Sequence, residues 1–349
     1  MTAIPPHYNA ANGRAFGYNP DAQAIFEAAT LFRRDHHILP AASDLRRNHL
    51  ILIDVQRDFC FPEGTLYVGG RSGQGAIEDT DRLARVIYEN LADISEITCT
   101  LDTHLPYQIF FAPFWVDASG QPLTPHRTIS VEEISAGAVR PNPNVADAAG
   151  APDLAWLNRQ VLHYAESLAK AGKYTLYLWP PHCLIGGVGH ALVGIIQEAR
   201  LFHAYARGAR NGVEIKGMHA LSENYSVFSP EVLTTHDGGS VASRNNALIN
   251  ALLHEDHLII AGQAASHCVK SSIEDLLTAI EATDKRLARR IYILEDAMSA
   301  VAVPDPSNPG SFFADFTDAA QAALERFRDA GMHVVKTTVP MSDWPEFAG

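Results

Sequence analysis

The chain has 349 residues, of which 47% are hydrophobic and 19% are charged. This composition is typical of a folded globular protein and excludes disorder over most of the length. Because 40 acidic residues outnumber 27 basic ones, the net charge of −13 disfavours nucleic acid as a partner, and we expect no local basic patch that overrides it.

The first residues and the cysteines indicate where the protein resides. The N-terminal sequence lacks the basic and then apolar pattern of a secretory signal, and no apolar run reaches about 18 residues. We therefore expect a cytoplasmic protein with no membrane partner. The four cysteines are widely spaced and form no Cys-x-x-Cys pair, which predicts free thiols rather than disulfides or a thiolate zinc site.

Residues 1–47 come before the first strong strand pattern, and we interpret them as an N-terminal extension with one helix near 21–36. Residues 48–349 are interpreted as the main domain. There the sequence predicts strands at 49–55, 96–102, 212–217, 257–262, 290–296 and 333–338, and helices near 75–93, 153–171, 268–282 and 312–330.

This alternation of short β-branched runs with amphipathic helices predicts a doubly wound α/β fold, in which a parallel sheet carries helices on both faces. Residues from about 105 to 175 interrupt the alternation with proline-rich turns. We expect them to form an insertion beside the carboxyl edge of the sheet.

Ligands of open parallel sheets bind beyond the carboxyl ends of the strands, so the residues that follow each strand are the first candidates for a site. Asp54 closes the first predicted strand, and Lys216 ends a later one. Taken singly, such an aspartate is more commonly a turn or helix-capping residue, and such a lysine more commonly faces solvent.

Cys268 opens a predicted helix shortly after the strand at 257–262. The helix dipole and the unpaired amides of a first turn favour a thiolate at this position. The small residues before it, in the sequence GQAAS, allow backbone N–H groups to approach a substrate carbonyl as an oxyanion hole. We therefore interpret Cys268 as a nucleophile, with a buried structural cysteine as the alternative.

Asp102 and His104 stand two residues apart after the second predicted strand, so they share one side of an extended segment. His182 follows two prolines that stiffen its backbone. Together the three side chains form a facial metal-ligand set with open positions for water or a ligand. The alternatives are a surface turn for the first pair and a packed loop histidine for His182.

Taken together, these positions resemble the isochorismatase-like cysteine hydrolases, and among them the nicotinamidases most closely, over roughly residues 48–338 outside the insertion. The family's Asp–Lys–Cys triad falls on Asp54 in IDVQRDF, on Lys216 in EIKG and on Cys268 in ASHCV. The resemblance implies an isochorismatase-like hydrolase fold, with residues 48–349 as the cysteine hydrolase domain.

The resemblance also implies a metal site on Asp102 and His104 in LDTHLP and on His182 in WPPHC. Zinc is the expected divalent ion, with iron and manganese as alternatives. Phe59 and Trp179 match the two aromatic residues that sandwich the pyridine ring in nicotinamidases.

The nucleophile loop of the family implies that the amides of Ala264 and Cys268 bind the oxyanion, and that the peptide between Gln263 and Ala264 is cis. The loop itself, GQAASHC, departs from the family's GVATD-C pattern at four positions: Gln263, Ala265, Ser266 and His267. Phe110 stands where some nicotinamidases carry a further histidine, and Arg57 stands where a small polar residue is common.

The implied activity is hydrolysis of a small-molecule carboxamide, nicotinamide to nicotinate and ammonia being the closest match, through a cysteine thioester. Two alternatives remain. One is a metal-free hydrolase of the same fold that acts on another amide, a carbamoyl or a ureido group, and the other is a non-catalytic binding protein. The sequence leaves the oligomeric state open, a homo-oligomer included.

Overall fold

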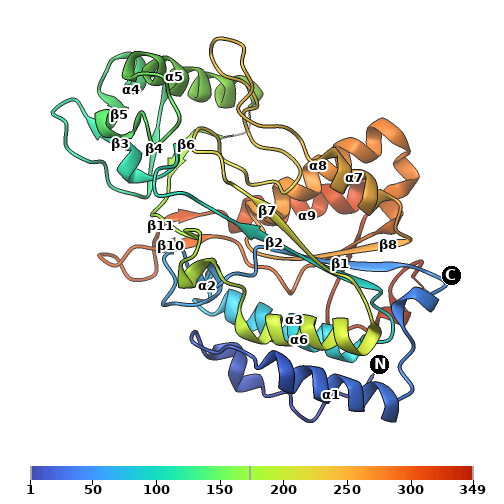
Figure 1. The fold of residues 1–349 in the computed structure, drawn as a ribbon. Coiled ribbons are helices and arrows are strands. Elements are labelled where there is room, and N and C mark those ends of the chain that lie inside the picture. The colour runs from blue at the N-terminus through green and yellow to red at the C-terminus, as the bar shows by residue number, and fades with distance from the viewer. Residues whose placement is uncertain (1, 173, 348–349) are drawn as a thin grey trace.

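A six-stranded parallel sheet forms the centre of the molecule (Figure 1). The structure, a computed structural model, describes residues 2–172 and 174–347. The strands of the sheet lie side by side in the order β12 (His333–Val335), β9 (Ile291–Leu294), β8 (His257–Gly262), β1 (Asn48–Ile53), β2 (Glu96–Asp102) and β7 (Asn211–Lys216). All neighbouring pairs in this sheet run parallel.

The central strands are apolar because both faces of the sheet are covered. Every residue of β1 is buried. Its alternate side chains enter two different cores: Leu50 and Leu52 pack in one, and Ile51 and Ile53 pack in the other.

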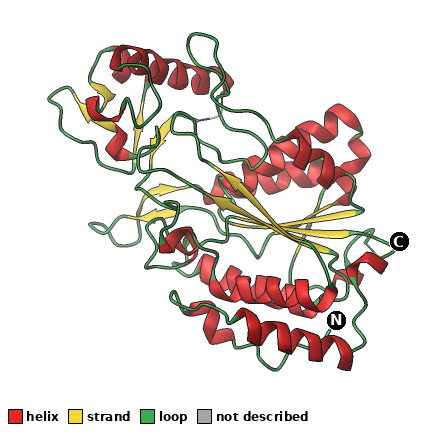
Figure 2. Ribbon diagram, in the orientation of Figure 1, coloured by secondary structure: helices red, strands yellow, loops and turns green. Residues whose placement is uncertain are grey.

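Helices form a layer on each side of the sheet (Figures 1 and 2). One layer contains α3 (Gly75–Glu89) and α6 (Gly194–Arg207), and the other contains α7 (Asn246–Leu253), α8 (Cys268–Thr283) and α9 (Thr317–Asp329). This arrangement confirms the predicted doubly wound α/β fold. None of the helices among the described residues is long and apolar enough to cross a membrane.

The N-terminal segment adds an outer layer to one face, where α1 (Ala22–Asp35) packs along the outside of α6 (Figure 1). Phe32 of α1 meets Phe202 of α6 with ring centroids 5.5 Å apart. The segment also neutralises a buried charge, because Asp44 accepts hydrogen bonds of 2.5 and 2.6 Å from Arg207. The described part of the N-terminal segment therefore packs against α6 and supplies a partner for Arg207.

Beyond the carboxyl ends of the strands lie several small elements (Figure 1). They are α2 (Arg57–Cys60), α4 (Val131–Ser135), α5 (Leu154–Ala171), the strand pair β3 (Trp115–Asp117) and β5 (Val139–Pro141), the pair β4 (Arg127–Ile129) and β6 (Leu176–Leu178), and the hairpin β10 (Ala302–Pro304) and β11 (Phe312–Asp315). Except for α2 and the hairpin, these elements belong to residues 105–178.

Several predicted elements differ from the observed ones at their ends, and two of these differences have a clear cause. The helix predicted near 312–330 begins only at Thr317, because residues Phe312–Asp315 pair with β10, and the Asp315 side chain accepts a hydrogen bond from the Thr317 amide. The strand predicted at 333–338 ends at Val335, because Thr337 bonds the Asp296 side chain instead of continuing the ladder.

The sequence analysis also missed α6. Four of its polar side chains are buried, namely Glu198, Arg200, His203 and Arg207. A surface helix is recognised in a sequence by the contrast between an apolar face and a polar face. This contrast is reduced in α6 because several of its polar residues are buried. The cause is tertiary. The N-terminal segment provides partners for Glu198 and Arg207, whereas His203 bonds the Ile94 carbonyl oxygen.

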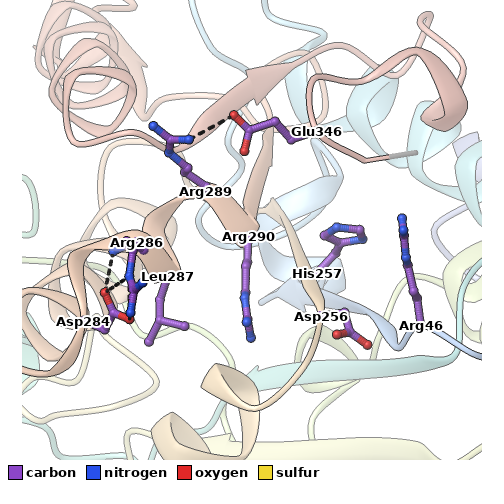
Figure 3. Close-up of a pocket in the computed structure, with 9 residues that line it drawn as sticks. All are labelled: Arg46, Asp256, His257, Asp284, Arg286, Leu287, Arg289, Arg290 and Glu346. Carbon is purple, nitrogen blue, oxygen red and sulfur yellow. Dashed lines mark hydrogen bonds and ion pairs between the residues drawn. The ribbon is translucent and has the colours of Figure 1, made fainter. Parts of the chain in front are cut away.

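Four arginines gather around a hollow of about 530 Å³ at the amino ends of the strands (Figure 3). The hollow is lined by Arg46, Asp256, His257, Asp284, Arg286, Leu287, Arg289, Arg290 and Glu346. The four arginines do not form an uncompensated basic patch. Three carboxylates in the same lining offset most of this charge, and two of them pair with arginines, Asp284 with Arg286 and Glu346 with Arg289.

Burial of His203 makes the stability of the fold sensitive to acid. Burial lowers the pKa of His203 from 6.5 to about 4, and its Nε2 bonds the Ile94 carbonyl oxygen at 2.9 Å. Between these pH values the unfolded chain binds a proton that the folded chain excludes, so stability is lost as the pH falls from about 6.5 to 4. The expected loss is at most about 3 kcal/mol.

We expect His203→Gln, measured by urea unfolding from pH 7 to 4, to lose less stability than the wild type over this window. The exposed residue His254 offers a matched control, and His254→Gln should follow the wild-type curve. Parallel curves for His203→Gln and the wild type would contradict this account.

Candidate active site

The carboxyl ends of four neighbouring strands bring together the residues that the sequence singled out. Asp54 directly follows β1, Asp102 ends β2, Lys216 ends β7, and Cys268 begins α8 after the loop that leaves β8. Since β8, β1, β2 and β7 are consecutive in the sheet, these four side chains meet at one edge. The chain leaves β1 and β8 in opposite directions across the sheet, and such a switch point is where doubly wound folds bind ligands.

The ammonium group of Lys216 is the meeting point of this cluster. Its Nζ lies 2.9 Å from Asp54 Oδ2 and 2.8 Å from Asp102 Oδ1. It also donates to the Asn224 carbonyl oxygen at 2.9 Å and lies 3.6 Å from Cys268 Sγ. One buried cation therefore touches two carboxylates and the thiol.

This arrangement keeps Lys216 charged although only 4% of its surface is exposed. Burial opposes the charge, but the carboxylates of Asp102 and Asp54 outweigh it and raise the pKa of Lys216 well above its ordinary value. Burial likewise disfavours the Asp102 carboxylate, yet His104 and Lys216 hold the pKa of Asp102 well below its usual range.

Asp54 and Cys268 have the opposite electrostatic balance. Burial raises the pKa of Asp54, although Lys216 acts against this shift, and Thr100 bonds the same carboxylate. Burial also raises the pKa of the Cys268 thiol, again opposed by Lys216. A raised pKa makes Asp54 a better acceptor for a proton that leaves the thiol.

The three predicted metal ligands lie together beside this cluster. One ligand atom from each of Asp102, His104 and His182 lies within 4.8 Å of the others, and all three residues are buried. His104 Nε2 is 2.8 Å from Asp102 Oδ2, and His182 Nε2 is 3.7 Å from the same oxygen.

The two imidazoles are oriented in the same way. His104 Nδ1 bonds the Gly217 carbonyl oxygen at 3.2 Å, and His182 Nδ1 bonds the Pro180 carbonyl oxygen at 2.8 Å. A ring nitrogen that donates to a carbonyl leaves the other nitrogen with a free lone pair, which is the usual arrangement of metal-bound histidine. Two nitrogens and a carboxylate oxygen thus converge on one point and fit a divalent transition-metal ion.

His182 reaches this point because its segment runs beside the chain that follows β2. The His104 amide donates to the Cys183 carbonyl oxygen at 3.0 Å, and the Trp179 amide donates to the Phe110 carbonyl oxygen at 2.8 Å. Phe110, which stands where some nicotinamidases carry a further histidine, is buried in the hydrophobic core, and its ring lies 5.0 Å from the His104 ring.

The loop before Cys268 contains the cis peptide that was expected between Gln263 and Ala264. The unusual residue Gln263 is held by hydrogen bonds: its Nε2 donates to Asp79 Oδ2 at 2.9 Å, and its Oε1 accepts from the Ser299 amide at 3.3 Å. This glutamine therefore fixes the shape of the loop that carries Ala264 and Cys268.

A narrow pocket leads to the thiol. It is lined by Phe59, Leu66, Val68, Asp102, Trp179, His182, Glu223, Tyr225, Ala264, His267, Cys268 and Val301. Both predicted aromatic residues are among them, and the Trp179 indole is fixed by a hydrogen bond of 2.8 Å from its Nε1 to Tyr225 Oη. Arg57, in contrast, donates to the Tyr18 carbonyl oxygen and to Asn19 in the N-terminal segment.

Three polar residues of the pocket were not among the predicted site residues. Burial raises the pKa of Glu223 to about 8, and burial lowers the pKa of His267 to about 3. Tyr225 lies 5.2 Å from the His267 ring. His267 could have been predicted, because it directly precedes Cys268 in the sequence. Glu223 and Tyr225 lie in a loop without periodicity, and only the fold places them at the pocket.

The chain was compared with protein families, curated proteins and solved structures. No family model and no curated protein matches the chain. Among solved structures, the yeast nicotinamidase Pnc1p bound to the inhibitor nicotinaldehyde is 20% identical, with a TM-score of 0.50 over 83% of this chain and 99% of that one. A nicotinamidase from Acinetobacter baumannii is 17% identical, with a TM-score of 0.48 over 85% of this chain and 99% of that one.

The first of these likenesses establishes the fold. The parallel sheet, the helices on both faces and the match over nearly the whole of the yeast enzyme confirm the expected isochorismatase-like α/β fold.

The location of Cys268 predicts selective alkylation. It lines the pocket beside a lysine, whereas Cys60, Cys99 and Cys183 are at most 1% exposed. Iodoacetamide should therefore modify Cys268 at least about tenfold faster than the other thiols, as followed by peptide mass spectrometry. Earlier labelling of any other cysteine would contradict the described geometry.

Proposed function

We propose that the protein is a cysteine amidohydrolase that cleaves the carboxamide of a small aromatic molecule, with nicotinamide as the substrate and nicotinate and ammonia as the products. The observation that carries this proposal is the contact of Lys216 Nζ with Asp54, Asp102 and the Cys268 sulfur. A buried thiol, a carboxylate of raised pKa and a fixed ammonium group are the components of nucleophilic catalysis at a carbonyl.

In this proposal, Asp54 removes the proton from Cys268. An Asp54 carboxylate oxygen lies within 4.8 Å of Cys268 Sγ, and Lys216 stabilises the developing thiolate from 3.6 Å. The thiolate then attacks the carboxamide carbon and forms a tetrahedral intermediate. Asp54 returns the proton to the leaving ammonia, and water hydrolyses the thioester to the free acid and the thiol.

The oxyanion of the tetrahedral intermediate needs hydrogen-bond donors, and we assign them to the amides of Ala264 and Cys268. Both residues line the pocket, and Cys268 is the first residue of α8, where the amides point out of the helix. Donors of this kind contribute roughly 3 kcal/mol each in other hydrolases.

We assign a divalent metal ion, with zinc as the first choice, to Asp102, His104 and His182, whose donor atoms fit such an ion. When bound, the ion supplies a Lewis-acidic position for a ring nitrogen of the substrate. Asp102 would then serve both sites, because its Oδ1 contacts Lys216 while its Oδ2 faces His104.

Two features of the pocket and one protein of similar fold support nicotinamide as the substrate. Phe59 and Trp179 supply aromatic walls for a flat ring, and the histidine pair lies beside them, with the Phe59 and His182 rings 5.4 Å apart. The yeast protein of similar fold is a nicotinamidase that was solved with nicotinaldehyde. A substrate without a flat ring would stack on neither aromatic wall and would offer no ring nitrogen to the proposed metal ion.

Removal of the nucleophile tests the mechanism. Cys268→Ala should fold as the wild type does and lower the release of ammonia from nicotinamide by at least about a thousandfold, because no thioester can form. Cys99→Ala removes another buried thiol and should keep its activity. Substantial turnover by Cys268→Ala would exclude the cysteine mechanism.

Removal of the metal tests the substrate assignment. His182→Ala, or treatment with a chelator, should lower activity on nicotinamide, and added zinc should restore only the chelated wild type. The exposed His219 provides the control variant His219→Ala, which should behave as the wild type. Full activity of a metal-free preparation on a non-aromatic amide, with none on nicotinamide, would instead favour a different amide substrate.

A further inference from the structure

A second group of potential metal ligands lies at the opposite end of the sheet. Atoms of His49, Glu96 and Glu255 that can bind a metal lie within 4.8 Å of one another. His49 is the second residue of β1, Glu96 begins β2, and Glu255 lies between α7 and β8. Asp54 is five residues further along the chain than His49, so the two sites are roughly 15 Å apart.

His49 carries the strongest sign of a ligand. Its side chain is buried, at 5% exposure, and its Nδ1 has no hydrogen-bond partner among the described residues. Its Nε2 is 2.8 Å from Thr98 Oγ1. In the tautomer in which Nε2–H donates to that hydroxyl, Nδ1 carries the lone pair that a metal ion needs. Burial without a hydrogen bond therefore makes Nδ1 a candidate ligand atom.

The distance to Glu255 agrees with a shared ion. His49 Nδ1 is 3.7 Å from Glu255 Oε1. Two ligand atoms that each lie about 2.1 Å from a tetrahedral zinc ion are roughly 3.4 Å apart, so a small movement of either side chain suffices.

Among the described lysines and arginines, only Arg47 forms ion pairs with Glu96 and Glu255. It does not contact Oε1 of Glu255, the oxygen that faces His49. It bonds Oε2 of Glu255 at 3.2 Å and Oε2 of Glu96 at 3.1 Å. Two glutamates share the single positive charge of this arginine. Arg47 thus orients the carboxylates, and their negative charge favours a cation between Glu255 Oε1 and His49.

We propose that His49, Glu96 and Glu255 form a second metal site that binds a divalent transition-metal ion, zinc in the first place. One imidazole nitrogen and two carboxylate oxygens are a suitable donor set for zinc, with water in the remaining position. The ion would join β1, β2 and the segment between α7 and β8, so its binding would stabilise the folded chain. The proposal does not depend on the catalytic function.

The test is the number of zinc equivalents that remain bound after dialysis against buffered zinc. His49→Ala should bind one equivalent fewer than the wild type, whether or not the Asp102 site is also occupied. Glu255→Gln preserves the shape of the side chain and should weaken this one equivalent by at least about tenfold. His254→Ala, which removes the exposed neighbouring histidine, should bind as many equivalents as the wild type.

Zinc should also raise the melting temperature of the wild type more than that of His49→Ala. Equal zinc content of the wild type, His49→Ala and Glu255→Gln would overturn the proposal. If His49→Ala does not fold, Glu255→Gln decides alone, and unchanged zinc affinity in that variant would overturn the proposal as well.

Discussion

The candidate site depends on one buried ion cluster, in which a single ammonium group compensates two carboxylates. A buried charge without a partner is costly, and removal of one member of such a cluster leaves the others uncompensated. Lys216 contacts Asp54, Asp102 and Cys268 at once, so it fixes the relative positions of the ends of β1, β2 and β7 and the start of α8. In the proposed function, the same contacts that order this edge of the sheet also stabilise the thiolate of Cys268.

Asp102 connects this cluster to the second half of the site. Its two oxygens face different partners, Lys216 on one side and His104 on the other. A change in the occupancy of the metal position would therefore alter the electrostatic environment of Lys216 and, through it, of Cys268. In the proposed reaction, substrate orientation and nucleophile activation are coupled through one carboxylate.

The N-terminal segment has a physical role beyond packing against the outside of α6. It supplies Asp44 to the buried Arg207, and it supplies the Tyr18 carbonyl oxygen to Arg57, which begins α2 close behind Asp54. Tyr18 also bonds Glu198 of α6. The N-terminal segment thus supplies hydrogen-bond partners to buried polar side chains of both α6 and α2.

The sequence by itself determined the parallel α/β architecture and the residues that follow its strands, because apolar strand runs and the residue that ends each run are local properties. Asp54, Asp102, Lys216 and Cys268 were found in this way. Only the tertiary structure decided the rest. Glu223 and Tyr225 reach the pocket from an irregular loop. The pattern of helix α6 is hard to recognise in the sequence because several of its polar side chains are buried. His49 and Glu255 lie together although about 200 residues separate them in the chain. Such contacts depend on how distant segments pack, which local patterns do not encode.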